Sequence, residues 1–304
     1  MTTAVPPAAP AVTVPNPAKA FLRLVMIEHS VFALPFAYLA ALYASFSASR
    51  TVHWRAILLV TIAMVAARTF AMAVNRVVDR RHDARNPRTA QRELVTGTVS
   101  VRTAVVGSLV ALAVFLTAAG LLSLLCLALA PIALLLFVSY PYGKRFTWLC
   151  HGLLGLAQAV GPIGAWLGVS GHWSWPSVLL GFAVGLWIGG FDLIYAMQDI
   201  ESDRAQGVYS LPARFGGAVA LRTAAASHVV TLGLFAWFGA AVHAGAWWWV
   251  GLVVVAVAFA YEHSLVKPHD LSKVNRAFFT ANGVVGIALF AFGLFDLLAR
   301  GLGA

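Results

Sequence analysis

Charged residues are scarce in this chain, since Asp, Glu, Lys and Arg together make up only 11% of its 304 residues. Soluble domains carry about 25% charged and about 45–50% apolar residues. Here 61% of the residues are hydrophobic, and the mean hydropathy is +0.83. This composition excludes a soluble globular enzyme, and its aliphatic and aromatic content excludes a disordered chain. It is the composition of a membrane protein with many spans.

Cysteine is also rare. Cys126 and Cys150 both lie in apolar stretches without metal-ligand spacing, and we interpret them as small apolar core residues. Acidic residues number 11 against 21 Lys and Arg, which gives a net charge of +10. In a soluble protein this excess would indicate nucleic-acid binding. In a membrane protein it indicates basic cytoplasmic loops, so we expect no nucleic-acid partner.

The chain divides into an uncharged leader and a membrane domain. Residues 1–18 are rich in Pro and Ala and lack the basic start of a signal peptide, so we predict a disordered leader there and one membrane domain over 19–304. A span requires about 20 mostly apolar residues. Nine stretches satisfy this in an all-α fold: 21–46, 55–78, 102–121, 123–141, 148–169, 177–198, 222–242, 246–266 and 278–299.

The basic residues predict the orientation of these spans. With the N-terminus in the cytoplasm, 17 of the 21 Lys and Arg residues lie on the cytoplasmic side and 3 on the other, while Arg68 lies within a span. Such asymmetry is typical of the positive-inside rule. It predicts a multi-pass protein of the cell (inner) membrane with an external C-terminus. The two long polar loops, 79–101 and 199–221, are then both cytoplasmic, and we expect function on that face.

Two segments where these loops begin share one spacing. They are Asn75, Asp79 and Asp83, and Tyr195, Asp199 and Asp203, each spaced i, i+4, i+8 and offset from each other by 120 residues. On a helix such residues share one face. Four carboxylates around one cavity repel each other, and Mg²⁺ is a cation that proteins hold with a few carboxylates plus substrate phosphates. The pattern predicts a Mg²⁺ site at Asp79, Asp83, Asp199 and Asp203, although a single DxxxD pattern also fits a solvated helix end.

Basic residues near these segments suit a diphosphate. Arg68 lies seven residues before Asn75 inside a predicted span, where a charge costs about 2.5–3.5 kcal/mol. It is either a ligand or half of a structural pair with an acidic residue such as Asp192 or Glu28. Lys144, which ends the fourth predicted span, is either a ligand or a positive-inside anchor, and the same choice applies to the neighbouring Arg145.

These motifs resemble those of the UbiA superfamily of intramembrane prenyltransferases. NRVVDRRHDARNPRTAQRELVTG (Asn75–Gly97) is similar to the NxxxDxxxD segment with its NPRT-type loop, and DLIYAMQDIESDRAQG (Asp192–Gly207) to the DxxYAxxDxxxD segment. The resemblance extends to YPYGKRFT, SLPARFG and EHSVFALPFA and covers the chain from about residue 20 to its end. It implies nine transmembrane helices around a central cavity open to the cytoplasm.

The resemblance also implies a reaction, the Mg²⁺-dependent transfer of a polyprenyl chain from its diphosphate to an acceptor. The four aspartates would hold the metal, and the diphosphate would be bound by Arg68, Asn75 and Lys144. Two further residues would act on an aromatic acid acceptor. Asp192 is the candidate base for the ring proton, and Arg145 is a candidate to hold the acceptor carboxylate. The expected partners are polyprenyl diphosphate, the aromatic acid and membrane lipid.

The residue that follows Asn75 bears on the identity of the acceptor. Arg76 follows Asn75 where 4-hydroxybenzoate enzymes more often have Asp, and this resembles the MqnP-like menaquinone branch. It favours a hydroxynaphthoate acceptor and menaquinone biosynthesis over a hydroxybenzoate acceptor and ubiquinone biosynthesis.

An ion-coupled secondary transporter and a non-catalytic scaffold are the alternatives to a prenyltransferase. Transporters usually have polar groups near the midplane and exits on both faces, so the one-sided acidic segments favour an enzyme.

Overall fold

The computed structural model describes residues 17–26 and 30–303. Residues 1–16 of the predicted leader lie outside this part, and the first helix begins at Pro17. Within the described residues the fold is helical and has no strands. The only extended pairing there is one isolated bridge, between Lys267 and Asp270. The predicted all-α class is confirmed.

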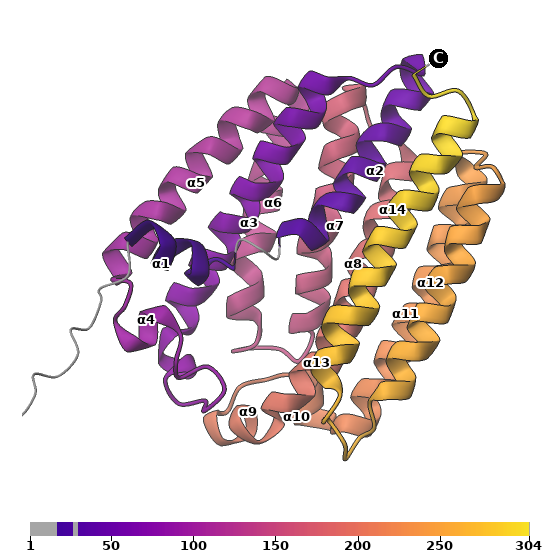
Figure 1. The fold of residues 1–304 in the computed structure, drawn as a ribbon. Helices are drawn as coiled ribbons and strands as arrows, with labels where there is room; N and C mark the ends of the chain where they lie inside the picture. The colour runs from indigo at the N-terminus through magenta and orange to yellow at the C-terminus, as the bar shows by residue number, and fades with distance from the viewer. Residues whose placement is uncertain (1–16, 27–29, 304) are drawn as a thin grey trace, which may run out of the picture.

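Long helices run side by side, and several short ones gather at one end (Figure 1). The long helices are α2 (Ser30–Ser49), α3 (Trp54–Asp83), α5 (Val101–Leu122), α6 (Leu124–Gly143), α7 (Cys150–Ser170), α8 (Trp175–Ala196), α11 (Gly217–Ala241), α12 (Ala246–Leu265) and α14 (Asn282–Ala299). The short segments are α1 (Pro17–Leu24), α4 (Glu93–Thr96), the 3₁₀ turn η2 (Met197–Asp199), α9 (Ile200–Gln206), α10 (Leu211–Phe215), α13 (Val274–Arg276) and the π-helical turn η3 (Ala277–Ala281).

Eight helical segments of the described chain are long and apolar enough to cross a membrane. They correspond to the second to ninth predicted stretches. The first stretch, 21–46, is wrong as one continuous span, because α1 ends at Leu24 and a turn follows it. With Lys19 and Arg23 among its eight residues, α1 has a polar face and packs against α3, α4 and α5. The apolar part of this stretch lies in α2, whose segment Leu34–Ser49 is a shorter apolar helix.

Ser123 divides two consecutive spans. Its backbone is extended, with φ −164° and ψ 155°, and its side-chain oxygen accepts a hydrogen bond from the Cys126 amide at 3.0 Å. This is the N-cap geometry, in which the side chain satisfies a donor that has no partner inside the helix. The predicted division around Gly120–Ser123 is confirmed.

Two glycines allow α7 and α8 to pack backbone to backbone. A Cβ added to Gly155 of α7 would lie 2.7 Å from the carbonyl oxygen of Gly185 in α8, and one added to Gly185 would lie 2.4 Å from that of Gly155. Any larger residue at either position would force the helices apart. This close contact fixes the position of α7 relative to α8.

The two acidic segments differ in backbone. Helix α3 continues through Asp83, so Asn75, Asp79 and Asp83 share one helix, as predicted. The second segment was expected to be one helix as well, and this is wrong. There α8 ends at Ala196, the 3₁₀ turn η2 carries Asp199, and α9 begins a new helix. The tighter turn redirects the chain, and α9 lies at the same end of the bundle as α4 and α10, away from the C-terminus (Figure 1).

Candidate active site

One cavity of about 850 Å³ extends into the helix bundle. Its apolar walls come from several helices and include Met64, Phe115, Phe137, Ile163 and Phe182. All four aspartates of the predicted metal site line it, as do the predicted residues Arg68, Asn75, Lys144 and Asp192. The cavity therefore combines a charged region with an apolar interior, which suits a ligand with a charged head and an apolar tail.

Asp79 is the most buried of the four aspartates, with 2% of its surface exposed. Its Oδ2 accepts a hydrogen bond from Nζ of Lys144, the residue that follows α6. Its Oδ1 is buried and has no hydrogen-bond partner among the described residues. A buried acceptor left without a partner costs about 1–3 kcal/mol, and more when it is charged. Asp79 therefore has one oxygen available to a cation in the cavity.

Asp83, one turn further along α3, is held by the loop that follows it. Nη1 of Arg92 donates to Oδ1 of Asp83 at 2.6 Å, and the Thr89 hydroxyl donates to the Asp83 backbone oxygen at 3.0 Å. The loop thus folds back over the end of α3, and it brings a second basic side chain to the acidic region.

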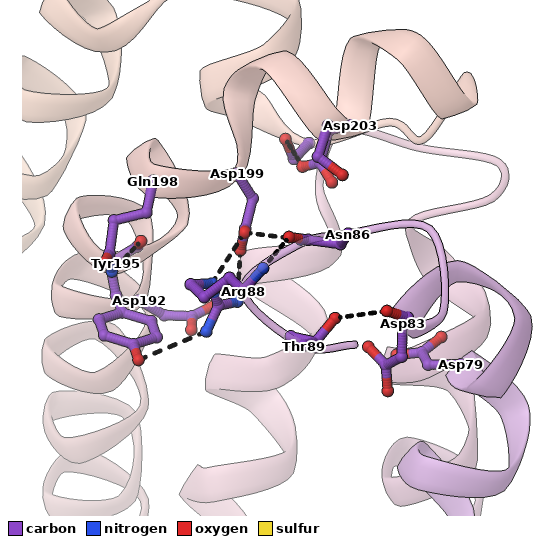
Figure 2. Close-up of polar contacts among 12 residues, drawn as sticks. Asp79, Asp83, Asn86, Arg88, Thr89, Asp192, Tyr195, Gln198, Asp199 and Asp203 are labelled. Atoms are coloured by element: carbon purple, nitrogen blue, oxygen red, sulfur yellow. Dashed lines mark hydrogen bonds and ion pairs between the residues drawn. The ribbon is translucent and has the colours of Figure 1, made fainter. Parts of the chain in front are cut away.

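Asp199 receives the most hydrogen bonds from this loop (Figure 2). Arg88 donates through Nε to Oδ1 at 2.9 Å and through Nη2 to Oδ2 at 2.6 Å, a bidentate pair, and Asn86 donates to Oδ1 at 2.8 Å. The Arg88 guanidinium also lies over the Tyr195 ring, 5.2 Å from its centroid. Burial alone would lower the pKa of Arg88, but the hydrogen bonds to Asp199 and its negative charge raise that pKa above the ordinary value.

Asp203 completes the acidic set from α9. Its Oδ2 accepts a hydrogen bond from the Ser210 hydroxyl at 2.8 Å, and Ser210 also caps α10 by accepting from the Ala213 amide. Asp203 and Asp199 line the cavity together with the two aspartates of α3. The structure therefore brings the two acidic segments to one cavity, although they are about 120 residues apart in the sequence.

Asp192 lies in α8, before the second acidic segment, and pairs with a histidine. Its Oδ2 is 2.7 Å from Nδ1 of His151, the second residue of α7. Two acidic residues were considered as partners for Arg68. One of them, Asp192, contacts His151, and the other, Glu28, lies outside the described residues. Arg68 itself lines the cavity from α3.

Arg145 is placed differently from the other predicted site residues. It is not among the described residues that line the cavity. Its Nη2 donates to the Val78 backbone oxygen at 2.7 Å, and its guanidinium lies 5.2 Å from the centroid of the Tyr142 ring. In this conformation Arg145 ties the segment after α6 to α3, next to Asp79.

Four polar residues at this site were not predicted from the sequence: Asn86, Arg88, Arg92 and His151. Three of them belong to the NPRT-type loop, so their place directly after the first acidic segment was a usable signal. His151 gave no such signal, because a single histidine at the start of an apolar stretch looks like any core residue.

Donor chemistry and position both make the acidic region suitable for a divalent metal. It offers only oxygen ligands from carboxylates, which Mg²⁺ prefers, and one of them is the unpartnered Oδ1 of Asp79. In the described part of the chain no three His, Cys, Asp or Glu side chains converge on one point. Instead Lys144, Arg88 and Arg92 each neutralise one aspartate. The four aspartates of the acidic segments therefore suit a metal ion that is held partly by protein carboxylates and partly by the phosphates of a substrate.

Comparison with known proteins identifies a matching family and several relatives. Residues 33–284 match the model of the UbiA prenyltransferase family. The chain is 34% identical to a 4-hydroxybenzoate octaprenyltransferase of Pseudomonas fluorescens, over 80% of this chain and 82% of the relative. It is 30% identical to the enzyme of the same name from Chromohalobacter salexigens, over 89% of this chain and 90% of the relative.

Solved structures have the same fold. The apo structure of a UbiA homolog from Aeropyrum pernix K1 superposes with a TM-score of 0.80 at 33% identity, over 89% of this chain and 98% of that one. A UbiA homolog from Archaeoglobus fulgidus bound to DMAPP and Mg²⁺ has a TM-score of 0.70 at 20% identity, over 92% and 99% of the two chains. Given the family match, the relatives and the shared architecture, the chain belongs to the UbiA prenyltransferase family.

Proposed function

We propose that this chain transfers a polyprenyl group from its diphosphate to an aromatic hydroxyacid. The observation that carries this proposal is one cavity of about 850 Å³ that combines the four aspartates of the acidic segments and five Lys and Arg side chains with an apolar interior. A diphosphate requires the charged region and a polyprenyl tail requires the apolar one. Membership of a prenyltransferase family decides against the transporter and scaffold alternatives.

Asp79, Asp83, Asp199 and Asp203 would hold Mg²⁺ between them and the diphosphate. The bound metal would supply Lewis-acid stabilisation of the charge that develops on the leaving diphosphate. The A. fulgidus homolog, whose structure contains DMAPP and Mg²⁺, supports this assignment by its shared fold.

The chain's own cations and apolar walls do the remaining work. Lys144, Arg88 and Arg92 line the cavity and would stabilise negative charge on the departing diphosphate, with Arg68 and Asn75 further along the α3 wall. The apolar walls exclude water, so the allylic cation formed when the C–O bond breaks meets the aromatic acceptor before it meets water. Ring faces such as those of Phe137 and Phe191 attract that cation.

The choice of acceptor draws on two observations that point in different directions. The two relatives described above are named 4-hydroxybenzoate octaprenyltransferases, which supports a hydroxybenzoate and does not support the preference for a hydroxynaphthoate. The Asn75-Arg76 pair favoured a hydroxynaphthoate. In the structure Arg76 is buried and donates to the Leu24 backbone oxygen at 3.2 Å, so it has a structural role in holding the end of α1. We therefore place 4-hydroxybenzoate first.

The protein is a multi-pass membrane protein, and we propose that its acidic site faces the cytoplasm. The distribution of Lys and Arg supports a cytoplasmic N-terminus and an external C-terminus. Both long loops, with α4, α9 and α10, lie at one end of the bundle, and the C-terminus lies at the other (Figure 1). This arrangement agrees with one functional face.

A transfer assay tests the proposal. The purified chain in lipid is given a radiolabelled polyprenyl diphosphate, Mg²⁺ and one acceptor at a time. The acceptors are 4-hydroxybenzoate, 1,4-dihydroxy-2-naphthoate and benzoate. We expect label in prenylated 4-hydroxybenzoate and none in benzoate, which lacks the activating hydroxyl. Transfer to the naphthoate alone would overturn the choice of acceptor, and the absence of transfer to either hydroxyacid would overturn the function.

A further inference from the structure

We propose that His151 is the general base that removes the ring proton of the acceptor, and that Asp192 orients its imidazole. This inference rests on the proposed function and deepens it. From the sequence, Asp192 alone was the candidate for that role. In the structure the carboxylate lies 2.7 Å from Nδ1 of His151, and both residues line the cavity that contains the acidic region.

The hydrogen bond determines which nitrogen is available. An ionised carboxylate only accepts hydrogen bonds, so Nδ1 of His151 carries the proton and donates it to Asp192. In the neutral imidazole Nε2 is then the lone-pair acceptor. This nitrogen is buried and has no hydrogen-bond partner among the described residues, in a side chain that is more than nine-tenths buried. The arrangement therefore leaves Nε2 without a partner in the described chain, in a residue that lines the cavity.

Another buried histidine gives a useful contrast. His228 of α11 has its Nδ1 at 3.0 Å from Nε2 of His263 and its Nε2 at 3.3 Å from the Trp187 backbone oxygen. Both of its nitrogens are occupied, as expected for a residue that stabilises the core. His151 has one nitrogen engaged by a carboxylate and the other free of any such contact in the described chain, which is the arrangement of a base and its orienting group.

The packing of α7 and α8 makes this pair rigid. His151 is four residues before Gly155 in α7, and Asp192 is seven residues after Gly185 in α8. Because these two glycines allow direct backbone contact, the histidine and the aspartate are held on rigid helices. Asp192 stabilises the imidazolium that forms when His151 takes up the proton.

The C–O bond of the prenyl diphosphate breaks, and its electron pair leaves with the diphosphate. A π electron pair of the ring forms the new C–C bond ortho to the hydroxyl. The C–H bond at that carbon then breaks, its electron pair restores the aromatic ring, and the proton moves to Nε2 of His151. The imidazolium releases this proton to water after the product leaves.

Ring deuteration of the acceptor tests the proposal. For the wild-type chain we expect the same rate with ordinary and ring-deuterated 4-hydroxybenzoate, because proton removal is fast. His151→Gln should lower kcat by about 10²-fold to 10⁴-fold, as expected when a general base is lost. It should also produce a primary deuterium isotope effect, because proton removal becomes rate-limiting. Prenyl diphosphate binding, measured by the KM of that substrate, should stay near the wild-type value.

Matched variants keep the test decisive. His172→Gln changes an exposed histidine in the loop between α7 and α8 and should retain wild-type kinetics. If His151→Gln fails to fold, His151→Asn can keep the donor to Asp192 and should show the same isotope effect. Wild-type kcat in a His151 variant, or a fall in kcat without an isotope effect, would overturn the role of His151. Failure of the wild-type chain to transfer at all would instead overturn the proposed function.

Discussion

Lys144 donates a hydrogen bond from Nζ to Oδ2 of Asp79, while Oδ1 of the same carboxylate is buried and has no hydrogen-bond partner in the described chain. The two residues come from different parts of the sequence, the end of α3 and the residue after α6. In this arrangement the unpartnered Oδ1 of Asp79 is suited to bind a cation in the cavity. The neighbouring Lys144 is suited to bind an anion there.

Asp79→Asn should reduce prenyl transfer by at least about 10²-fold, the scale on which loss of one group that stabilises transition-state charge acts. The amide keeps the size of the side chain but removes the negative charge that would hold the metal. Product formation from labelled polyprenyl diphosphate measures the effect. Glu201→Gln is the matched control, because Glu201 is an exposed carboxylate of α9 outside the cavity lining. Equal activity of the two variants would contradict the assignment.

Removal of divalent metal should abolish transfer reversibly. Four aspartates around one cavity need a cation to bind a diphosphate, because anions otherwise meet anions. After treatment with EDTA we expect product formation to stop, and added Mg²⁺ should restore it in the wild-type chain. Asp199→Asn should require a higher Mg²⁺ concentration for half-maximal activity. Full turnover of metal-free protein would show that the four aspartates serve another purpose.

Arg88→Ala should raise the KM for polyprenyl diphosphate by about 10-fold to 10²-fold, since a hydrogen bond to a charged group contributes roughly 1.5–3 kcal/mol. Contacts with Asp199 and Tyr195 hold the Arg88 guanidinium at the cavity, where the diphosphate would bind. Steady-state kinetics at varied diphosphate concentration measure the change. Arg85→Ala removes an exposed arginine of the same loop and should leave the KM unchanged. An equal effect of both substitutions would indicate only a loss of net positive charge.

Asn282→Ala should destabilise the bundle by about 1–3 kcal/mol, the cost of leaving buried polar groups without partners. Asn282 accepts from Trp187 Nε1 at 2.8 Å and donates to Glu262 Oε1 at 3.1 Å, and all three side chains are buried. Thermal unfolding in detergent should show a lower melting temperature. Asn275→Ala, at an exposed position of α13, should unfold like the wild-type chain. Identical melting of the two variants would rule out a stabilising role for this cluster.

Single cysteines should report the orientation in the membrane. In a chain whose Cys126 and Cys150 are replaced by Ala, Arg85→Cys lies in the loop after α3 and His172→Cys in the loop between α7 and α8. A membrane-impermeant maleimide should label Arg85→Cys only when the cytoplasmic face is accessible, and His172→Cys only from outside. The reverse pattern would contradict the orientation predicted from the basic loops.

The helices were predictable because hydropathy and cap residues act locally. Ser123 lies between two predicted stretches, and its side chain and extended backbone separate α5 from α6 in the structure. The first acidic segment was also predictable, because its spacing matches the continuous helix α3. The prediction failed at 21–46 and at Asp199, where a turn and a 3₁₀ segment break what looked like continuous helix.

Contacts between distant side chains could not be predicted from the sequence. The Arg88–Asp199 pair joins residues 111 positions apart, and His151 and Asp192 are 41 positions apart. Glu262 lies near the end of the predicted stretch 246–266, where the sequence alone does not show that it is buried. It is 0% exposed and bound by Asn282, which α14 supplies. In each case the partner lies on another element of the fold, so tertiary packing decides the environment of the charge.

The most direct test of the central claim compares two products of one reaction. The purified wild-type chain is incubated in lipid with labelled polyprenyl diphosphate, Mg²⁺ and 4-hydroxybenzoate, and both prenylated acid and free diphosphate are quantified. We predict equal amounts of the two products, and neither product in the Asp79→Asn variant. Release of diphosphate without prenylated acid, or equal formation of prenylated acid by the variant, would contradict the claim that this carboxylate-lined cavity transfers a polyprenyl group.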